Sequence, residues 1–180
     1  MSSVRVVVPT PEEAAGLVPA LADILIDCVE GGASVSFLLP IERRVAEDYY
    51  QRVVDKLETS GVTLFVAHVD QELAGTVLLS PVLIENQPHR AEVFKLLVHR
   101  RARNRGAAEC LMRALEHKAA ELGRPLLSLD TTAGTPSERL YTKLGWQRLG
   151  VMPGHALLPD GRVSDTTFFW KQLDTPPRRC

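Results

Sequence analysis

The sequence has few of the features that mark specialised proteins. Its cysteines, Cys28, Cys110 and Cys180, are odd in number and show no CxxC spacing, which argues against a disulfide scaffold and favours the reduced cytoplasm. Its five histidines show neither HExxH nor other paired-ligand spacing, so we expect no metal ion. No apolar run approaches the ~20 residues that span a bilayer, and the N-terminus lacks a signal-peptide core. We therefore expect a cytoplasmic protein with no membrane partner.

An excess of one charge is also lacking. The net charge of the 180 residues is −1, so the basic cluster from Arg100 to Arg105 is a local feature. A nucleic-acid-binding surface is normally broader, and we expect no nucleic-acid partner. The chain is 45% hydrophobic and 24% charged. This composition predicts one globular domain over residues 1–180, with a frayed tail from about residue 175.

Two common phosphate-binding motifs are missing. GxxxxGK[ST] does not occur, and no GxGxxG follows a strand, so a nucleoside triphosphatase or a dinucleotide-binding fold has no support. The chain instead has a basic glycine loop that leads into an alanine- and leucine-rich stretch, RARNRGAAECLMRALEHKAAELG, from Arg101 to Gly123. The order of basic, glycine and apolar residues in this stretch predicts its structure.

This stretch predicts a helix whose N-terminus binds phosphate. Apolar residues recur at three- and four-residue spacing up to Gly123, which ends the helix. Gly106 falls at the first turn, where backbone N–H groups lack intrahelical partners and the helix dipole is positive. For the arginine cluster alone, a surface helix with a basic start is the simpler interpretation. The apolar strand expected at Ala91–His99 favours a phosphate-binding turn, because strand, glycine loop and helix then follow in order.

Hydrophobic periodicity along the rest of the chain predicts an α/β fold. The further expected helices are Pro11–Val29, Pro40–Glu58 and Ser137–Leu144. The expected strands are Val4–Val8, Thr63–Val69, Leu73–Ser80, Ala91–His99, Leu126–Asp130, Gln147–Val151 and Thr166–Leu173. The short turn DQE predicts an antiparallel hairpin, and the helix between Ala91 and Asp130 implies parallel neighbours. We expect a mixed sheet of six or seven strands with helices on both faces.

Several motifs resemble one enzyme family. Arg103-x-x-Gly106-x-Ala108 resembles the acetyl-coenzyme A (acetyl-CoA) loop of the GNAT acetyltransferase superfamily. SERLYTKLGW, from Ser137 to Trp146, is similar to the late helix and following strand of that superfamily, with Tyr141 at the position of its usual tyrosine. GGASVSF, RAEVFKLLV, LSLDTTAG and MPGHALLPDGR together resemble the tabtoxin resistance branch, which acetylates a β-lactam amino-acid toxin. The chain departs from the pattern at Gly134, where many members have an asparagine.

The resemblance implies a GNAT-like sheet that splays between its two middle parallel strands, with acetyl-CoA as cosubstrate and no metal. The cofactor's pantetheine arm would pair with the freed strand edge, and its pyrophosphate would lie on the loop. A backbone N–H of Leu97 or Val98 would stabilise the oxyanion. The implied partner is a small-molecule amine, and the implied state is a monomer or homodimer. The implied cofactor-binding residues are Leu96, Leu97, Val98, Arg103, Asn104, Arg105, Gly106, Ala107 and Ala108.

Acyl transfer from a thioester to an amine needs a base for the amine and an acid for the thiolate. Glu92 and Asp130, at the ends of the two middle strands, are the candidate bases, and Tyr141 is the candidate acid. Each has a structural alternative: an ion pair with Arg90 or Arg101 for Glu92, a turn acceptor for Asp130, and a core position for Tyr141. Parallel strands would place the two carboxylates near opposite ends of the cleft unless loops bring them together.

The acceptor is expected to bind between two long loops, GGASVSFLL and PGHALLPDGR, because loops carry specificity. Their pocket candidates are Ser34, Ser36, Phe37 and His155. Neither loop is acidic, which favours a small zwitterionic acceptor such as an amino-acid-like toxin or antibiotic over a polycation. A protein N-terminus, a polyamine or an aminoglycoside as acceptor, and a non-catalytic acetyl-CoA sensor, are the alternatives.

Overall fold

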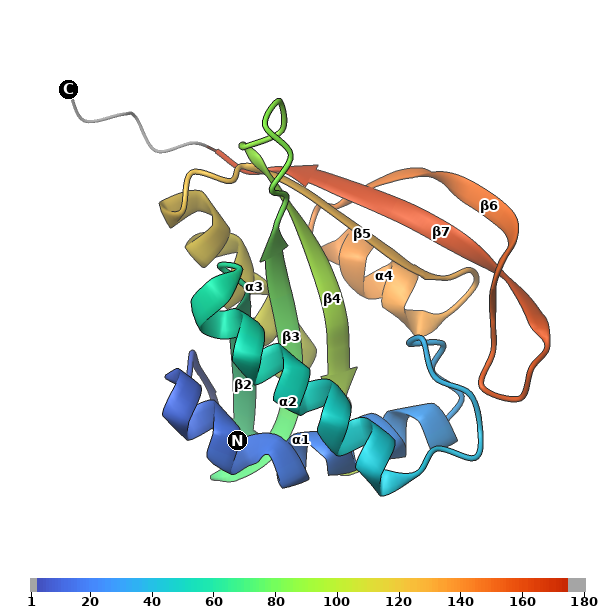
Figure 1. The fold of residues 1–180 in the computed structure, drawn as a ribbon. Helices are drawn as coiled ribbons and strands as arrows, with labels where there is room; N and C mark the ends of the chain where they lie inside the picture. Colours follow the sequence, from blue (N-terminus) through green and yellow to red (C-terminus); the bar gives the residue numbers. More distant parts are fainter. Residues whose placement is uncertain (1–2, 175–180) are drawn as a thin grey trace.

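The computed structural model describes residues 3–174 and contains a seven-stranded mixed sheet with helices on both faces (Figure 1). The strands lie in the order β1-β2-β3-β4-β5-β7-β6. They are β1 (Val4–Val7), β2 (Thr63–Val69), β3 (Glu72–Pro81), β4 (Arg90–Val98), β5 (Leu126–Thr132), β6 (Gln147–Leu157) and β7 (Val163–Gln172). The helices are α1 (Pro11–Glu30), α2 (Arg43–Thr59), η1 (Arg100–Ala102), α3 (Ala107–Glu121) and α4 (Pro136–Lys143). The predicted sheet is confirmed, and the tail expected from residue 175 lies outside the described residues.

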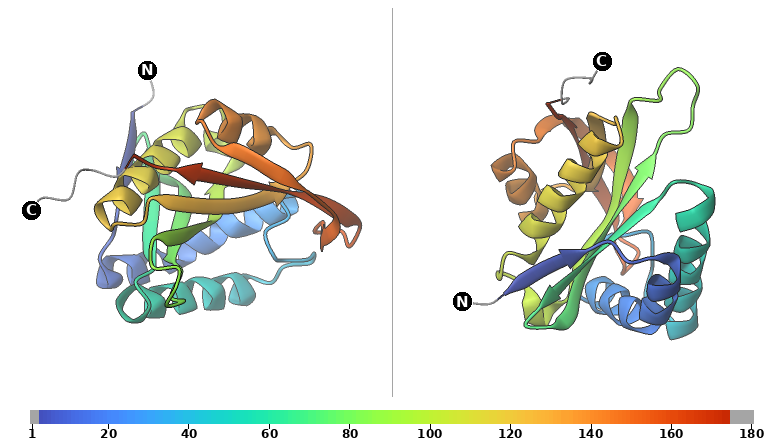
Figure 2. Two further views of the ribbon diagram at one scale, coloured as in Figure 1. Left: turned by 90° about the horizontal axis from the view of Figure 1, so that it is seen from above. Right: turned by 90° about the vertical axis from the view of Figure 1, so that its left-hand side faces the viewer.

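Helix α1 begins where the sequence predicts. Thr10 Oγ1 accepts a hydrogen bond from the Glu13 N–H (3.3 Å), and Glu13 Oε2 accepts one from the Thr10 N–H (2.8 Å). With Pro11 in the first turn, this capping box fixes the start of the helix. The apolar residues of α1 and α2 then pack together on one face of the sheet (Figure 2).

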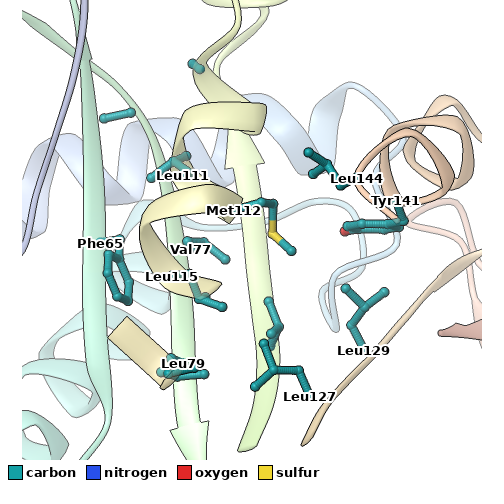
Figure 3. Close-up of a cluster of buried hydrophobic side chains, with 14 of the residues drawn as sticks. Phe65, Val77, Leu79, Leu111, Met112, Leu115, Leu127, Leu129, Tyr141 and Leu144 are labelled. Carbon is teal, nitrogen blue, oxygen red and sulfur yellow. The ribbon is translucent and has the colours of Figure 1, made fainter. Parts of the chain in front are cut away.

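Helix α3 covers the opposite face of the sheet, beside α4 (Figure 2). Leu111, Met112 and Leu115 of α3 are fully buried and pack over the central strands (Figure 3). Their spacing matches one face of a helix. Tyr141 of α4 belongs to the same core cluster. The sheet therefore separates two apolar cores, one under α1 and α2 and one under α3 and α4.

Helix α2 starts later than its sequence predicts. Glu42 is the N-cap residue, and the helix runs from Arg43 rather than from Pro40. The residues before it serve a tertiary contact, because the Leu39 N–H donates to the Pro159 carbonyl (2.8 Å) in the turn between β6 and β7. Residues 31–42 therefore form a connection that reaches from α1 to the β6–β7 hairpin (Figure 1).

Strand β6 is longer than expected, which corrects the prediction of a long loop before the last strand. The segment Met152–Leu157 is part of β6, and β7 already begins at Val163. The register between the two strands shifts between Arg148 and Gly150 and again between Met152 and Ala156. Because β6 is an edge strand whose residues are almost all exposed, it shows no apolar–polar alternation from which the sequence could identify it.

Candidate active site

The central parallel strands separate soon after they pair. Strands β4 and β5 are in register only from Arg90 to Glu92 and from Leu126 to Ser128. Beyond Glu92, β4 follows β3 through a β-bulge, since Leu78 lies opposite Phe94 while Thr76 lies opposite Leu97. Lys95 in the bulge has a φ of 54°, which is uncommon for a residue with a side chain. The result is a gap between the carboxyl-terminal halves of β4 and β5.

The two candidate bases lie on the same face of this gap. Ala91 and Val93 belong to the core under α3, so the alternation of side chains along a strand directs Glu92 to the α1–α2 face. Leu129 belongs to that core too, so Asp130 also faces α1 and α2. Glu92 is in register with Ser128, and Asp130 is two residues further along β5. The expectation that the carboxylates lie near opposite ends of the cleft is therefore wrong, because the strands pair at their first residues.

The structural alternatives for these carboxylates are only partly realised. Arg90 Nη2 lies 3.8 Å from Glu92 Oε1, and the Glu92 side chain is 45% exposed. Asp130 is exposed within β5 and is not part of the turn that the alternative interpretation assumed. Its carboxylate makes no hydrogen bond or ion pair with residues 3–174. Both groups are therefore accessible from the α1–α2 side.

Tyr141 lies on the other face of the sheet. Its ring contacts Trp146 (centroids 6.0 Å apart) and Phe169 (5.6 Å), so the expected core packing is present. Figure 3 shows the ring near Leu129, with its hydroxyl oxygen at the end directed away from α4. Burial raises the pKa of Tyr141, and the negative charge of Asp130 raises it further. The tyrosine thus stays protonated near neutral pH and lies within electrostatic reach of Asp130.

The glycine loop forms the N-terminus of α3 as predicted. Gly106 is the N-cap residue in the left-handed region (φ 85°), and no side chain of residues 3–174 caps the helix. Asn104 is also left-handed (φ 61°). A Cβ added to Gly106 would have no heavy atom of the described residues within 4 Å, so this part of the chain leaves open space in front of the turn. Uncapped N–H groups beside open space provide the features of an anion-binding helix terminus.

The arginine side chains around this loop mostly contact the protein itself. Arg100 binds Asp27, whose Oδ2 also accepts from the Arg100 N–H (2.8 Å). Arg101 Nη2 donates to the Leu73 carbonyl (2.9 Å). Arg103 Nε donates to the Val98 carbonyl (3.2 Å), and Arg105 pairs with Asp70. These contacts fix the loop to α1 and to the β2–β3 turn, which is a structural use of the cluster.

The predicted acceptor residues are tied to different parts of the chain. Ser34 Oγ donates to the Leu157 carbonyl (2.8 Å), which holds the 31–42 connection against β6. Ser36 Oγ accepts a hydrogen bond from Lys95 Nζ (3.0 Å). The Phe37 ring makes an edge contact with Tyr49 of α2 (5.4 Å). Ser36 and Phe37 therefore meet near the bulge of β4.

His155 reaches the same face of the sheet from β6. Its ring contacts Phe168 (5.3 Å), and its Nδ1 lies 3.3 Å from Thr166 Oγ1. Phe168 is paired directly with Asp130, so the two side chains project on the same side. Through Phe168, His155 is placed beside the exposed carboxylate of β5.

Sequence reasoning missed three residues of this face: Lys95, Tyr49 and Phe168. One signal could have identified Lys95, because a lysine inside the apolar run VFKLLV is unusual for a buried strand. Tyr49 and Phe168 gave no such signal, since an aromatic residue on a helix or strand face is most often a core residue.

Within residues 3–174, no three His, Cys, Asp or Glu side chains form a group that could hold a metal ion. None of the helices in this part of the chain is both long and apolar enough to cross a bilayer.

Comparison with known proteins was made on both sequence and structure. Residues 24–146 match the model of the family described as "Acetyltransferase (GNAT) family". A ribosomal-protein-alanine N-acetyltransferase from Brucella melitensis is similar in structure, with a TM-score of 0.79 and 23% identity over 94% of this chain and 99% of that chain. A Salmonella typhimurium protein assigned as an acetyltransferase was solved with its cofactor acetyl-CoA. It has a TM-score of 0.75 and 19% sequence identity over 99% of both chains.

A protein assigned as a phosphinothricin N-acetyltransferase gives a TM-score of 0.78 and 18% identity over 96% of this chain and 99% of that chain. At these identities the three similarities establish a shared fold. The match to the family model, which spans more than half of the 180 residues, is the independent indication of kinship.

Proposed function

The chain belongs to the acetyltransferase (GNAT) family, and we propose that it transfers the acetyl group of acetyl-CoA to the primary amine of a small zwitterionic molecule. One observation carries this proposal. At the gap between β4 and β5, Glu92 and Asp130 lie on one face of the sheet and Tyr141 lies on the other. An acyl transfer needs a base at the attacking amine and an acid at the departing thiolate, and the candidates for these two roles lie on opposite sides of one opening.

The residues around the gap fit acetyl-CoA, which supplies the acetyl group as a thioester. The N–H groups of Gly106, Ala107 and Ala108, with that of Asn104 before them, would hold the pyrophosphate at the start of α3, whereas the Arg103 N–H donates to the Arg100 carbonyl (3.4 Å). The side chains of Arg103 and Arg105 already have protein partners, so we assign phosphate binding chiefly to backbone N–H groups. This assignment fits a loop with two left-handed residues and no side-chain cap.

The freed edge of β4 would hold the pantetheine arm. The His99 N–H donates to the Ala74 carbonyl of β3 (2.9 Å), and backbone groups along a strand alternate between its two sides. By this alternation Leu97 faces β3, and Leu96 and Val98 face the gap. The Val98 carbonyl already accepts from Arg103. We therefore assign cofactor pairing to Leu96 and oxyanion stabilisation to the Val98 N–H, while Leu97 contributes packing.

The reaction can then be divided among the residues of the chain. Glu92 or Asp130 takes a proton from the acceptor ammonium, directly or through water, on the α1–α2 face. The free amine attacks the thioester carbonyl, and the Val98 N–H stabilises the oxygen of the tetrahedral intermediate. As the intermediate collapses, the positively charged nitrogen gives its second proton to water, and Tyr141 gives its hydroxyl proton to the departing thiolate on the α3–α4 face and is reprotonated from solvent. Its raised pKa keeps the hydroxyl protonated at neutral pH.

A small acceptor with both charges matches the charges beside the gap better than a polycation does. The α1–α2 face of the gap holds the carboxylates Glu92 and Asp130 together with the ammonium of Lys95, so a polyamine or aminoglycoside would meet a positive charge. The finer proposal is an amino-acid-like toxin or antibiotic of the tabtoxinine-β-lactam type. Its support is the sequence resemblance, since GGASVSF and RAEVFKLLV supply the acceptor connection and β4. Resistance to such a compound would be the physiological role.

The test is a screen of amines by release of free thiol from acetyl-CoA. Amino acids, the β-lactam toxin, polyamines, aminoglycosides and N-terminal peptides form the panel, and each rate is corrected for a blank without acceptor because Cys110 is partly accessible. We expect turnover with zwitterionic amino compounds. Turnover only with peptides would assign an N-terminal acetyltransferase, and binding of acetyl-CoA without any turnover would indicate a sensor.

A further inference from the structure

Lys95 places an ammonium group among neutral partners on the α1–α2 face of the sheet, beside the gap between β4 and β5. Its Nζ donates to the Val35 carbonyl (2.7 Å) and to Ser36 Oγ (3.0 Å). It also lies over the rings of Phe37 (5.7 Å to the centroid) and Tyr49 (5.6 Å). Two oxygens and two aromatic rings fix the position of the charge, and cation–π contacts of this kind favour a cation.

This ammonium has no ionic partner in the described chain. Nζ makes no ion pair with any carboxylate of residues 3–174, and two of the three donors of an ammonium are used. Burial lowers the pKa of Lys95 to about 8, and the negative charge of Asp130 opposes that effect without being in contact. A partly buried charge without a counter-ion is unfavourable unless another group compensates for it. Lys95 therefore has one N–H donor without an acceptor and a positive charge without a counter-ion in the described chain.

The backbone of β4 determines where the Lys95 side chain lies with respect to the gap. The bulge of β4, where Lys95 has a left-handed backbone, redirects the side chain toward residues 31–42. That connection is in turn held against β6 and the β6–β7 turn by Ser34 and Leu39. Lys95 therefore lies under the connection and on the same face of the sheet as Asp130. One positive and one negative group stand apart from each other across the acceptor side of the gap.

We propose that Lys95 is the specificity residue that binds the carboxylate of an amino-acid acceptor, with the amine of the same molecule directed to Asp130 and Glu92. This inference rests on the proposed acetyltransferase function and narrows its substrate class to α-amino acids and compounds that share their amino-carboxylate group. A carboxylate on Lys95 would use its remaining N–H donor and supply the missing counter-ion. The opposite orientation would put like charges together at both ends of the cleft.

The test compares α-amino acids with their own α-carboxamides as acceptors. Each pair has the same side chain, and kcat/KM is measured as a function of pH so that the plateau values of the two classes are compared, because the two amines titrate differently. For the wild-type protein we expect kcat/KM to be about 10–100-fold higher for the acids, the usual range for a hydrogen bond to a charged group. Equal values for acids and carboxamides would overturn the carboxylate site.

The variant Lys95→Met separates recognition from support of the loop. Methionine keeps an unbranched chain against the two rings and removes the charge. We expect kcat/KM for the acids to fall about 10–100-fold, to the level of the carboxamides. We expect kcat/KM for the carboxamides to change by less than about threefold. An equal loss for both classes would mean that Lys95 only holds the connection and the bulge. If this variant does not fold, the wild-type comparison decides by itself.

Failure of the inference and failure of the proposed function give different results. If the protein acetylates carboxamides with the same kcat/KM as acids, the proposed acetyltransferase function stands and only the carboxylate site is wrong. A protein that binds acetyl-CoA by calorimetry and releases no thiol with any amine of the panel loses both.

Discussion

Glu92 of β4 lies directly opposite Ser128 of β5, and this is the last pair in register between the two strands. The backbones separate immediately after it, while Asp130 continues on the same face two residues further along β5. The opening of the sheet and the two carboxylates therefore coincide. Since the unpaired part of β4 also contains the bulge at Lys95, the parts of the site that handle the amine, the carbonyl oxygen and the cofactor edge lie within a few residues of one another.

Replacement of Gly106 by aspartate should abolish acetyl-CoA binding. A Cβ at Gly106 has no heavy atom of residues 3–174 within 4 Å, and the change places a carboxylate where we expect the pyrophosphate. Gly106→Asn is the matched control, because asparagine has the same shape without the charge and tolerates a left-handed backbone. Calorimetry should show no binding for Gly106→Asp and weakened binding for Gly106→Asn. Wild-type affinity in a folded Gly106→Asp protein would show that the loop does not bind the cofactor.

Tyr141→Phe should lower kcat by about 10²–10⁴, the usual scale for a general acid or base. The fold and the cofactor affinity should be preserved, because the ring keeps its contacts with Trp146 and Phe169. Tyr50→Phe is the control, since it removes the hydroxyl of another buried tyrosine that has no hydrogen-bond partner in the described chain. We expect Tyr50→Phe to have wild-type kcat and equal or higher stability. Unchanged turnover in Tyr141→Phe would leave Tyr141 a core residue only.

Glu92→Gln and Asp130→Asn should identify the base through the pH dependence of kcat/KM. An amide keeps the size and hydrogen bonding of the carboxylate and cannot take a proton. Loss of the base should lower kcat/KM near neutral pH and allow partial recovery at high pH, where the amine is free without assistance. Asp55→Asn, the same change on the exposed face of α2, controls for lost surface charge.

If kcat/KM falls by the same factor at every pH, the affected carboxylate positions the acceptor ammonium and does not act as the base. If both variants are folded and neither changes the rate at any pH, water leading to solvent acts as the base and the roles proposed for Glu92 and Asp130 are wrong.

Lys95 should make the stability of the protein depend on pH in the alkaline range. Its pKa is about 8 in the folded protein against an ordinary value near 10.5, so between these values the unfolded chain binds more protons. The free energy of unfolding therefore rises with pH in this window, and the burial penalty is fully present below about pH 8. Urea unfolding should show that the stability of the wild type relative to Lys95→Met increases by roughly 1–3 kcal/mol from about pH 7.5 to 10.5. A difference that stays constant with pH would place the Lys95 charge in water.

Parts of the chain with strong local signals were predicted well from the sequence. The start of α1 at Pro11, the helix after Gly106 and the β2–β3 hairpin all form as expected, because helix caps, left-handed glycines and apolar periodicity act within a few residues. The parallel pairing of β4 with β5 also follows from the intervening helix. The late start of α2 and the length of β6 were missed, since both depend on contacts between the 31–42 connection and the β6–β7 hairpin.

For the candidate site, the sequence by itself identified the candidates for chemistry: Glu92 and Asp130 as carboxylates at the ends of expected strands, and Tyr141 and the Gly106 loop by their resemblance to family motifs. Only the tertiary structure decided how they are arranged. A register that covers three residues of each strand puts the two carboxylates on one face, and a bulge turns Lys95 toward Val35 and Ser36, some sixty residues away along the chain. Pairing register and bulge position are set by interactions between distant strands, so no pattern local to the sequence could have specified them.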